Sequence, residues 1–150
     1  MPEEDLDTFY AYPVSSMAVA DFCACMALAA RAYDSVDKVF AWRMEAAAKL
    51  SWQWLEKNPD PVLFVNPQGS NTGEYGDSTD ADERLWAAAE MMLLAARRGE
   101  DRQKYVAEIR RILATGLNVT DFGWTDVAGF AALAVLTDFR QNAGEELQEI

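Results

Sequence analysis

The chain has 150 residues, 51% of them hydrophobic, and carries 13 basic against 25 acidic residues, for a formal net charge of −12. This length and composition predict one globular domain, and the absence of any Lys/Arg cluster argues against a nucleic-acid or anionic-membrane partner. The sequence has no histidine, which excludes Ser-His-Asp and Cys-His catalysis and histidine-ligated zinc.

No segment reaches the roughly eighteen continuous apolar residues of a membrane span. The acidic start, Met1-Pro2-Glu3-Glu4-Asp5, is the opposite of the basic region that opens a signal peptide. The sequence therefore predicts no membrane segment and no signal peptide, so that either the chain is cytoplasmic or its natural start has been removed.

Helical periodicity dominates, and the first two predicted helices form a hairpin. Ser15 or Ser16 caps a helix that runs to about Tyr33. A second helix runs from about Val36 to Lys57, with one apolar stripe at i, i+3, i+4 spacing and a second apolar row that predicts burial on two sides. The stripe holds Val36, Val39, Phe40, Met44, Ala47, Ala48, Trp54 and Leu55, and the second row holds Trp42, Ala46 and Leu50.

A long loop separates this hairpin from three further helices. Asn58-Pro59-Asp60-Pro61 ends the second helix, because proline lacks a backbone donor and restricts the residue before it. The loop continues to Asp80, and loops longer than about 12 to 15 residues in a compact domain are usually functional or disordered. The fold class is therefore all-α, with antiparallel helical hairpins over about residues 14–140 and a polar tail at 141–150. The later helices are predicted at about Ala81–Arg98, Arg102–Thr115 and Val127–Arg140.

The end of the long loop has the strongest indication of a ligand. Four formal negative charges fall within seven residues there: Asp77, Asp80, Asp82 and Glu83. Like charges this close repel unless a cation or a helix N-terminus compensates them. One interpretation is a helix cap, since Asp80 and Glu83 have the spacing of a capping box. The other is a calcium site, with carbonyl oxygens from Ser78 and Thr79 and carboxylates from Asp82 and Glu83.

Three segments resemble the glycoside hydrolases of family nine, the cellulases and related endoglucanases. The first comprises Ser15–Phe22 and Met26–Tyr33, the second comprises Thr72–Asp77 and Asp82–Glu90, and the third is Phe122–Val127. The similarity runs in order from about Tyr10 to Thr137, and the Asp82 to Glu90 run is its most specific part. The resemblance implies less than half of an (α/α)6 barrel of helical hairpins, with an open cleft across one end.

The resemblance also implies an activity, the inverting hydrolysis of β-1,4-glucan bonds of the cellulose type by a secreted parent enzyme. In the family, an Asp in an Asp-x-Gly-Asp motif is the base, and a Glu near the end of the domain is the acid. Neither segment occurs in this sequence. We therefore expect an endoglucanase fragment that has no catalytic residue of its own and is inactive alone.

Positions for a metal and for the substrate follow from the same resemblance. Some family members bind calcium through positions that match Ser78, Thr79, Asp82 and Glu83, plus an acid in the later loop that best matches Asp126. Aromatic side chains of these loops line the family's sugar cleft, which makes Tyr75 and Trp124 candidate substrate-binding residues. An alternative role for Trp124 is a hydrophobic staple at a helix start.

Two other classes of function stay open. A helical-hairpin protein-interaction module would also be rich in alanine, although these hairpins share no fixed-period consensus. A stand-alone enzyme that used the carboxylates of the loop would need a second catalytic group, which the sequence does not identify. For a partial barrel, we expect a homo-oligomer that buries the helix faces left open by missing hairpins.

Overall fold

The computed structural model describes residues 11–70, 73–74 and 76–142, and the regular secondary structure of these residues is entirely α-helical. The helices are α1 (Ser16–Ala32), α2 (Lys38–Lys57), α3 (Ala81–Arg98), α4 (Gln103–Leu113) and α5 (Ala128–Asn142). The predicted all-α class is confirmed, and the predicted helices lie within about two residues of those observed. Beyond the last turn of α5, the predicted polar tail lies outside the described residues.

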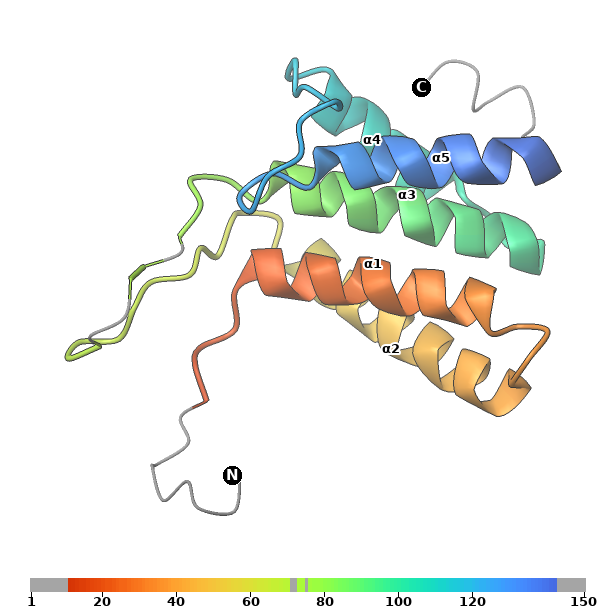
Figure 1. The fold of residues 1–150 in the computed structure, drawn as a ribbon, viewed down its shortest axis with the longest axis horizontal. Coiled ribbons are helices and arrows are strands. Elements are labelled where there is room, and N and C mark those ends of the chain that lie inside the picture. The colour runs from red at the N-terminus through yellow and green to blue at the C-terminus, as the bar shows by residue number, and fades with distance from the viewer. Residues whose placement is uncertain (1–10, 71–72, 75, 143–150) are drawn as a thin grey trace.

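The helices form two layers, in which α1, α3 and α5 lie side by side and α2 and α4 lie behind them (Figure 1). The three front helices run in one direction, and the two rear helices run in the opposite direction. In the front layer α3 packs on both α1 and α5, while α2 packs on α1 and α4 packs on α3. The arrangement is thus two antiparallel hairpins, α1–α2 and α3–α4, followed by α5.

This alternation separates two kinds of connection. Short turns at residues 33–37 and 99–102 lie at one end of the layers, and Gly99 ends α3 in the left-handed conformation at φ 67°. The long connections, residues 58–80 and 114–127, lie at the other end beside the start of α1 (Figure 1). We call these the turn end and the loop end. Every front helix begins at the loop end.

The core is centred on α3, which is buried on nearly all sides. Its large side chains pack against a face of α1 whose residues are small, and this allows the two helix axes to approach closely. The buried residues of α1 include Ala20, Cys23, Ala24, Ala27 and Ala30, and those of α3 include Leu85, Met91, Met92, Leu93 and Leu94.

The predicted burial of α2 on two sides is wrong. Asp37 is the N-cap, and its side chain accepts hydrogen bonds from the backbone N–H groups of Val39 and Phe40 at 3.0 and 2.9 Å, so the helix begins after it. One face of α2 meets α1, and among the described residues no element covers the opposite face. The exposed residues of the two predicted rows are therefore Val36 at 78%, Val39 at 70%, Trp42 at 68% and Leu50 at 67%, together with Ala46.

Candidate functional site

Three carboxylates converge where the long loop enters α3. Asp77, Asp82 and Glu83 each offer one oxygen, and these three oxygens lie within 4.8 Å of one another. Asp82 and Glu83 occupy the first turn of α3, where the helix dipole favours negative charge, and they are only 2% and 6% exposed. We refer to these three residues as the acid cluster.

Hydrogen bonds from the backbone hold two members of the acid cluster in place. Asp77 Oδ1 accepts from the N–H groups of Ser78, at 2.5 Å, and Thr79, at 3.4 Å. Asp82 Oδ2 accepts from the N–H of Val127, at 2.8 Å, immediately before α5 begins. The cluster is therefore connected to the start of α5 as well as to α3.

Other cluster oxygens have no such donor. Asp77 Oδ2 and Glu83 Oε2 are both buried, and neither has a hydrogen-bond partner among the described residues. Burial, followed by the negative charge of Asp82, raises the pKa of Glu83 to about 9. Carboxylates this close cannot all ionise without a compensating charge, so the geometry favours either a retained proton or a bound cation.

A fourth acid lies nearby on α1. Asp21 Oδ1 is buried without a hydrogen-bond partner among the described residues, and burial, followed by the negative charge of Asp82, raises the pKa of Asp21 to about 6. Sequence reasoning assigned no role to Asp21 and counted Asp77 only as one charge of the loop. The available signal for Asp21 was an acid inside the small, apolar face of α1, between Ala20 and Cys23.

The capping-box prediction for α3 is wrong. Asp80 is the N-cap residue, but its side chain makes no capping hydrogen bond. Instead, Thr79 Oγ1 accepts from the N–H of Ala81 at 3.2 Å, and Asp80 Oδ2 accepts from Arg84 Nε at 2.7 Å. Asp80 is thereby taken out of the acid cluster, since a buried arginine compensates its charge.

The remaining predicted site residues are placed as follows. Ser78 is exposed and Thr79 half-buried, next to the cluster in the chain. Asp126 Oδ1 accepts from the N–H of Ala128 at 3.1 Å at the start of α5, and Asp126 is not among the three acids whose oxygens lie within 4.8 Å of one another. Trp124 is 73% exposed, which leaves its ring accessible at the loop end. Tyr75 lies outside the described residues.

The donor set of the acid cluster fits a hard divalent cation. All its side-chain ligand atoms are carboxylate oxygens, which calcium and magnesium prefer, and sulfur or imidazole donors are absent from the cluster. Two of these oxygens, Asp77 Oδ2 and Glu83 Oε2, are also buried without a hydrogen-bond donor, and such unsatisfied buried groups are rare unless a ligand compensates them. The residues present therefore fit a cation site.

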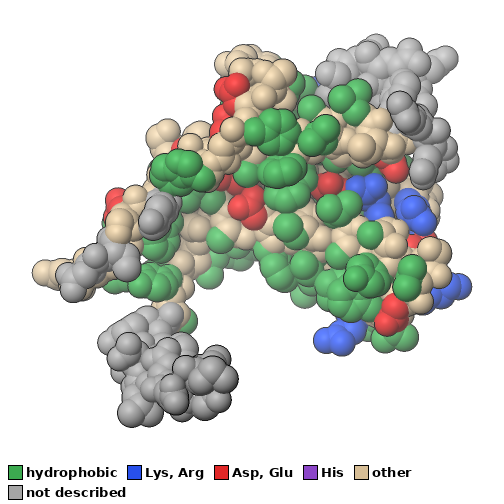
Figure 2. Space-filling view, in the orientation of Figure 1, with side chains coloured by type: hydrophobic (Ala, Val, Ile, Leu, Met, Phe, Trp, Pro, Cys, Tyr) green, Lys and Arg blue, Asp and Glu red, His purple; other side chains and the backbone are tan. Residues whose placement is uncertain are grey.

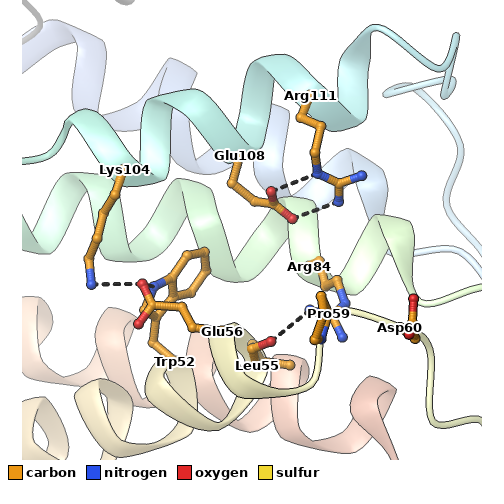
Figure 3. Close-up of a pocket in the computed structure, with 9 residues that line it drawn as sticks. All are labelled: Trp52, Leu55, Glu56, Pro59, Asp60, Arg84, Lys104, Glu108 and Arg111. Atoms are coloured by element: carbon orange, nitrogen blue, oxygen red, sulfur yellow. Dashed lines mark hydrogen bonds and ion pairs between the residues drawn. The ribbon is translucent and has the colours of Figure 1, made fainter.

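Arg84 connects the two ends of the long loop (Figure 3). This side chain on α3 is 6% exposed, and its guanidinium donates to three oxygens: Asp80 Oδ2 at 2.7 Å, the Leu55 carbonyl at 3.3 Å and the Asn58 carbonyl at 2.7 Å. The two carbonyls belong to the C-terminus of α2, where the helix dipole favours a positive charge. Arg84 thus joins the end of α2 to the start of α3.

A cavity of about 480 Å³ adjoins Arg84 between α2 and α4 (Figure 3). Four of its charged lining residues form two ion pairs: Lys104 Nζ lies 2.9 Å from Glu56, and Arg111 Nη2 lies 2.7 Å from Glu108. These four charges are compensated, and among the described lining residues no buried polar side-chain atom lacks a hydrogen-bond partner, in contrast to the acid cluster.

Comparison with known proteins identifies relatives along the whole chain. A model of glycosyl hydrolase family 9 matches residues 1–150. The chain is 34% identical to the cellodextrinase of Butyrivibrio fibrisolvens, over 95% of this chain and 28% of that protein. It is 39% identical to endoglucanase D of Acetivibrio thermocellus, over 93% of this chain and 22% of that protein.

Solved structures agree with the sequence relatives. The family 9 endoglucanase J30 superimposes with a TM-score of 0.81 at 28% identity, covering 99% of this chain and 27% of that one. A metagenome-derived family 9 endoglucanase superimposes with a TM-score of 0.77 at 31% identity, covering 97% of this chain and 25% of that one. The chain spans about a quarter of the length of these proteins.

Proposed function

Because the chain belongs to glycoside hydrolase family 9, we propose that it forms part of the catalytic domain of an enzyme that hydrolyses β-1,4-glucan bonds of the cellulose type with inversion. The observation that carries this proposal is the match of the family along the entire chain, together with a helical arrangement that is part of the family's (α/α)6 barrel. The relatives named as endoglucanases and a cellodextrinase support a glucan as the substrate class.

The acid cluster does not supply the catalytic pair. Inverting hydrolysis needs two carboxyl groups about 6.5 to 9.5 Å apart, with a water molecule between the base and the sugar. The clustered oxygens lie within 4.8 Å of one another, which is too close for that geometry. The family's base and acid segments are also not residues of this sequence, so we assign the chain no catalytic residue and expect it to be inactive alone.

The part of this chain in the reaction is to shape the substrate cleft. The long loops gather at one end of the helical layers (Figure 1), and the exposed indole of Trp124 lies in one of them. An exposed aromatic ring offers a flat apolar surface and, in tryptophan, a hydrogen-bond donor, both suited to a sugar ring. We propose Trp124 and Tyr75 as residues that contact the glucan.

A chimera tests this function. We would replace the matched segment of endoglucanase D with this chain and measure reducing sugar released from carboxymethylcellulose. The chimera should be active, its Trp124→Ala variant should be less active, and the isolated chain should be inactive. A folded chimera without activity, or activity of the isolated chain that a point substitution within it abolishes, would refute the proposal.

We also propose that the acid cluster binds calcium. Asp77, Asp82 and Glu83 would hold the ion, with Asp126 and the carbonyl oxygens of Ser78 and Thr79 as further oxygen ligands. The unpartnered, buried Glu83 oxygen is the observation that supports this most directly. When bound, calcium supplies positive charge that compensates the clustered carboxylates. Asp82, which also accepts from Val127 N–H, then holds the later loop against α3.

Thermal unfolding with and without calcium tests the metal site. A ligand that binds only the folded state stabilises it by about 2.7 kcal/mol at one hundred times Kd, which shifts the midpoint of a domain of this size by several degrees. Asp82→Asn and Glu83→Gln should abolish the shift and Asp126→Ala should weaken it, while magnesium should have little effect. Superimposable melting curves in EDTA and in millimolar calcium would assign the acids to capping instead.

The exposed apolar faces support a proposal about assembly. Hydrophobic side chains are spread over the face formed by α1, α3 and α5 (Figure 2). The exposed large hydrophobic residues include Phe22 and Leu28 on α1, Leu133 and Leu136 on α5, and Trp42 and Leu50 on α2. We propose that other hairpins of the barrel cover these faces in the parent enzyme, and that a second copy covers them in the isolated chain. The proposed self-association would be contradicted if light scattering showed a monodisperse monomer at micromolar concentration and the chain bound no hydrophobic dye.

The location of the parent enzyme follows from its substrate. None of the helices in the described part of the chain is long and apolar enough to cross a membrane. Cellulose-type polymers are too large to enter a cell, so we propose that the parent enzyme is secreted. Detection of the full-length enzyme in the cell lysate, with none in the culture medium, would contradict this.

A further inference from the structure

The cation site proposed above uses ligands from the loop and from α3, and it leaves one neighbouring carboxylate without a role. Asp21 lies in the second turn of α1, and its Oδ1 is buried with no hydrogen-bond partner among the described residues. Because α1 and α3 lie side by side and run in the same direction (Figure 1), the early turns of both helices share the loop end. The negative charge of Asp21 interacts with the charges of both Asp82 and Glu83.

We propose that Asp21 is a positioning residue of the cation site, whose charge on α1 strengthens calcium binding at the acid cluster and makes the ion a link between α1 and α3. This inference rests on the calcium site proposed above. Asp21 is not among the carboxylates whose oxygens lie within 4.8 Å of one another, so we assign it to the surroundings of the site rather than to the ligands.

The charge of Asp21 acts in opposite directions with and without a bound ion. Without an ion, a fourth partly buried carboxylate repels the acid cluster and destabilises the folded chain. With a divalent ion bound, the same carboxylate attracts it, because the sign of the local charge is reversed. Charge in the shell around a metal site typically changes affinity by roughly 10- to 100-fold.

The same helix interface shows how a buried acid is compensated by a protein side chain. Further along α1 and α3, Arg31 pairs with Glu90, and its Nη1 lies 3.5 Å from Asp138 on α5. Glu90 also accepts from the indole N–H of Trp86 at 3.3 Å. At Asp21 the corresponding oxygen has no donor from the described residues, so the two positions on one interface differ in what compensates the carboxylate.

The test compares Asp21→Asn with wild type and with a charge-matched control. Asp60→Asn removes the same charge from an exposed residue of the long loop, outside the acid cluster. Calcium binding would be measured by isothermal titration calorimetry and unfolding by thermal melts in EDTA. We expect Asp21→Asn to bind calcium roughly 10- to 100-fold more weakly and to melt at a higher temperature than wild type in EDTA. Asp60→Asn should match wild type in both measurements.

Two further variants separate charge from structure. Asp21→Glu retains the charge and should recover most of the calcium affinity, whereas Asp21→Ala should behave like Asp21→Asn. Circular dichroism establishes that each variant is folded. If wild type and Asp21→Asn bind calcium with equal Kd, this inference is overturned and the calcium site still stands. Wild type that binds no calcium would overturn both.

Discussion

Acidic side chains are paired with basic side chains at one end of the helical layers, whereas several of those described at the other end lie without such partners. At the turn end, Asp34 lies 2.7 Å from Arg98 Nη1 and 3.2 Å from Arg97 Nε, and Glu45 lies 2.7 Å from Arg98 Nε. Lys49 adds ion pairs to Glu45 and Glu100, each at 2.8 Å. At the loop end, buried carboxylate oxygens of Asp21, Asp77 and Glu83 have no donor among the described residues.

The titration behaviour of the two ends differs accordingly. Hydrogen bonds from Arg98 and Arg97 hold the pKa of Asp34 below its usual value, whereas burial and neighbouring negative charge raise the pKa of Asp21 and Glu83. Ion pairs like those of the turn end are common on protein surfaces. Buried carboxylates held together without a basic partner are uncommon and point to a functional site. The difference between the two ends therefore supports the cation site proposed at the loop end.

The largest expected effect concerns Asp80, a loop-end acid that is paired with a buried arginine, Arg84. Arg84→Met should destabilise the chain by about 3 to 5 kcal/mol, because it leaves Asp80 as a buried, unpaired charge and removes the donors to the Leu55 and Asn58 carbonyls. Urea unfolding monitored by circular dichroism measures this loss.

Two variants serve as controls for Arg84. Arg111→Met removes an arginine whose pair with Glu108 is exposed, and it should cost less than about 1 kcal/mol. The double variant Arg84→Met/Asp80→Asn should recover part of the stability, since no buried charge then lacks a partner. Equal losses of unfolding free energy for Arg84→Met and Arg111→Met would mean that the buried pair of Arg84 and Asp80 contributes no more to stability than a surface ion pair.

A smaller effect should appear on changing pH in EDTA. Because the folded-state pKa of Asp21, about 6, exceeds its unfolded value of 3.8, its contribution is fully present below pH 3.8 and is lost as the pH rises through 6. Glu83 acts in the same direction between its unfolded value of 4.5 and about 9. The midpoint of thermal unfolding should therefore rise on acidification from pH 8 to pH 5.

The turn end should reverse this trend at lower pH. Asp34 and Glu45 have pKa values below the usual range, so their contributions are present above their unfolded pKa values and are lost as the pH falls through the folded ones. Stability in EDTA should thus pass through a maximum in mildly acidic solution. Asp21→Asn should flatten the slope on the alkaline side of this maximum, and an unchanged slope would contradict the assignment to Asp21.

The smallest effect is expected at the turn end near neutral pH. Asp34→Asn removes two exposed ion pairs, whose attraction is weak in water and is screened by salt. Its melting temperature should lie slightly below that of wild type in dilute buffer and should match it in molar salt. A large loss that persists in molar salt would show that the turn end is more than a set of surface pairs.

Much of the fold can be predicted from local signals in the sequence. Ser15 caps α1 through the N–H of Ala18, the proline-rich segment after Asn58 ends α2, and Gly99 ends α3, so each boundary depends on residues near it. The exposed side of α2 could not be predicted in this way. Periodicity places Val39 and Trp42 on helix faces, but it does not report whether another element covers those faces.

The candidate site shows the same limit. Asp82 and Glu83 are recognisable because they are adjacent in a distinctive loop and helix start, and the structure brings them together with Asp77. The pairing of Asp80 with Arg84 competes with capping, and helix spacing alone does not decide between the two uses of one carboxylate. Asp21 stands 61 positions before Asp82 in the sequence, and only the packing of α1 on α3 brings their charges together.

The hydrogen bonds of Arg84 have a consequence for how the loop between α2 and α3 can change. Since the guanidinium joins the end of α2 to the start of α3, the loop between them is anchored at its base whatever the length of its tip. Closing a flexible loop becomes only about 0.6 kcal/mol more costly each time its length doubles. Insertions around Gln68 and Gly69 can therefore lengthen the loop while the helices beneath it keep their positions. The length of this loop is therefore a natural variable for evolution and for protein engineering.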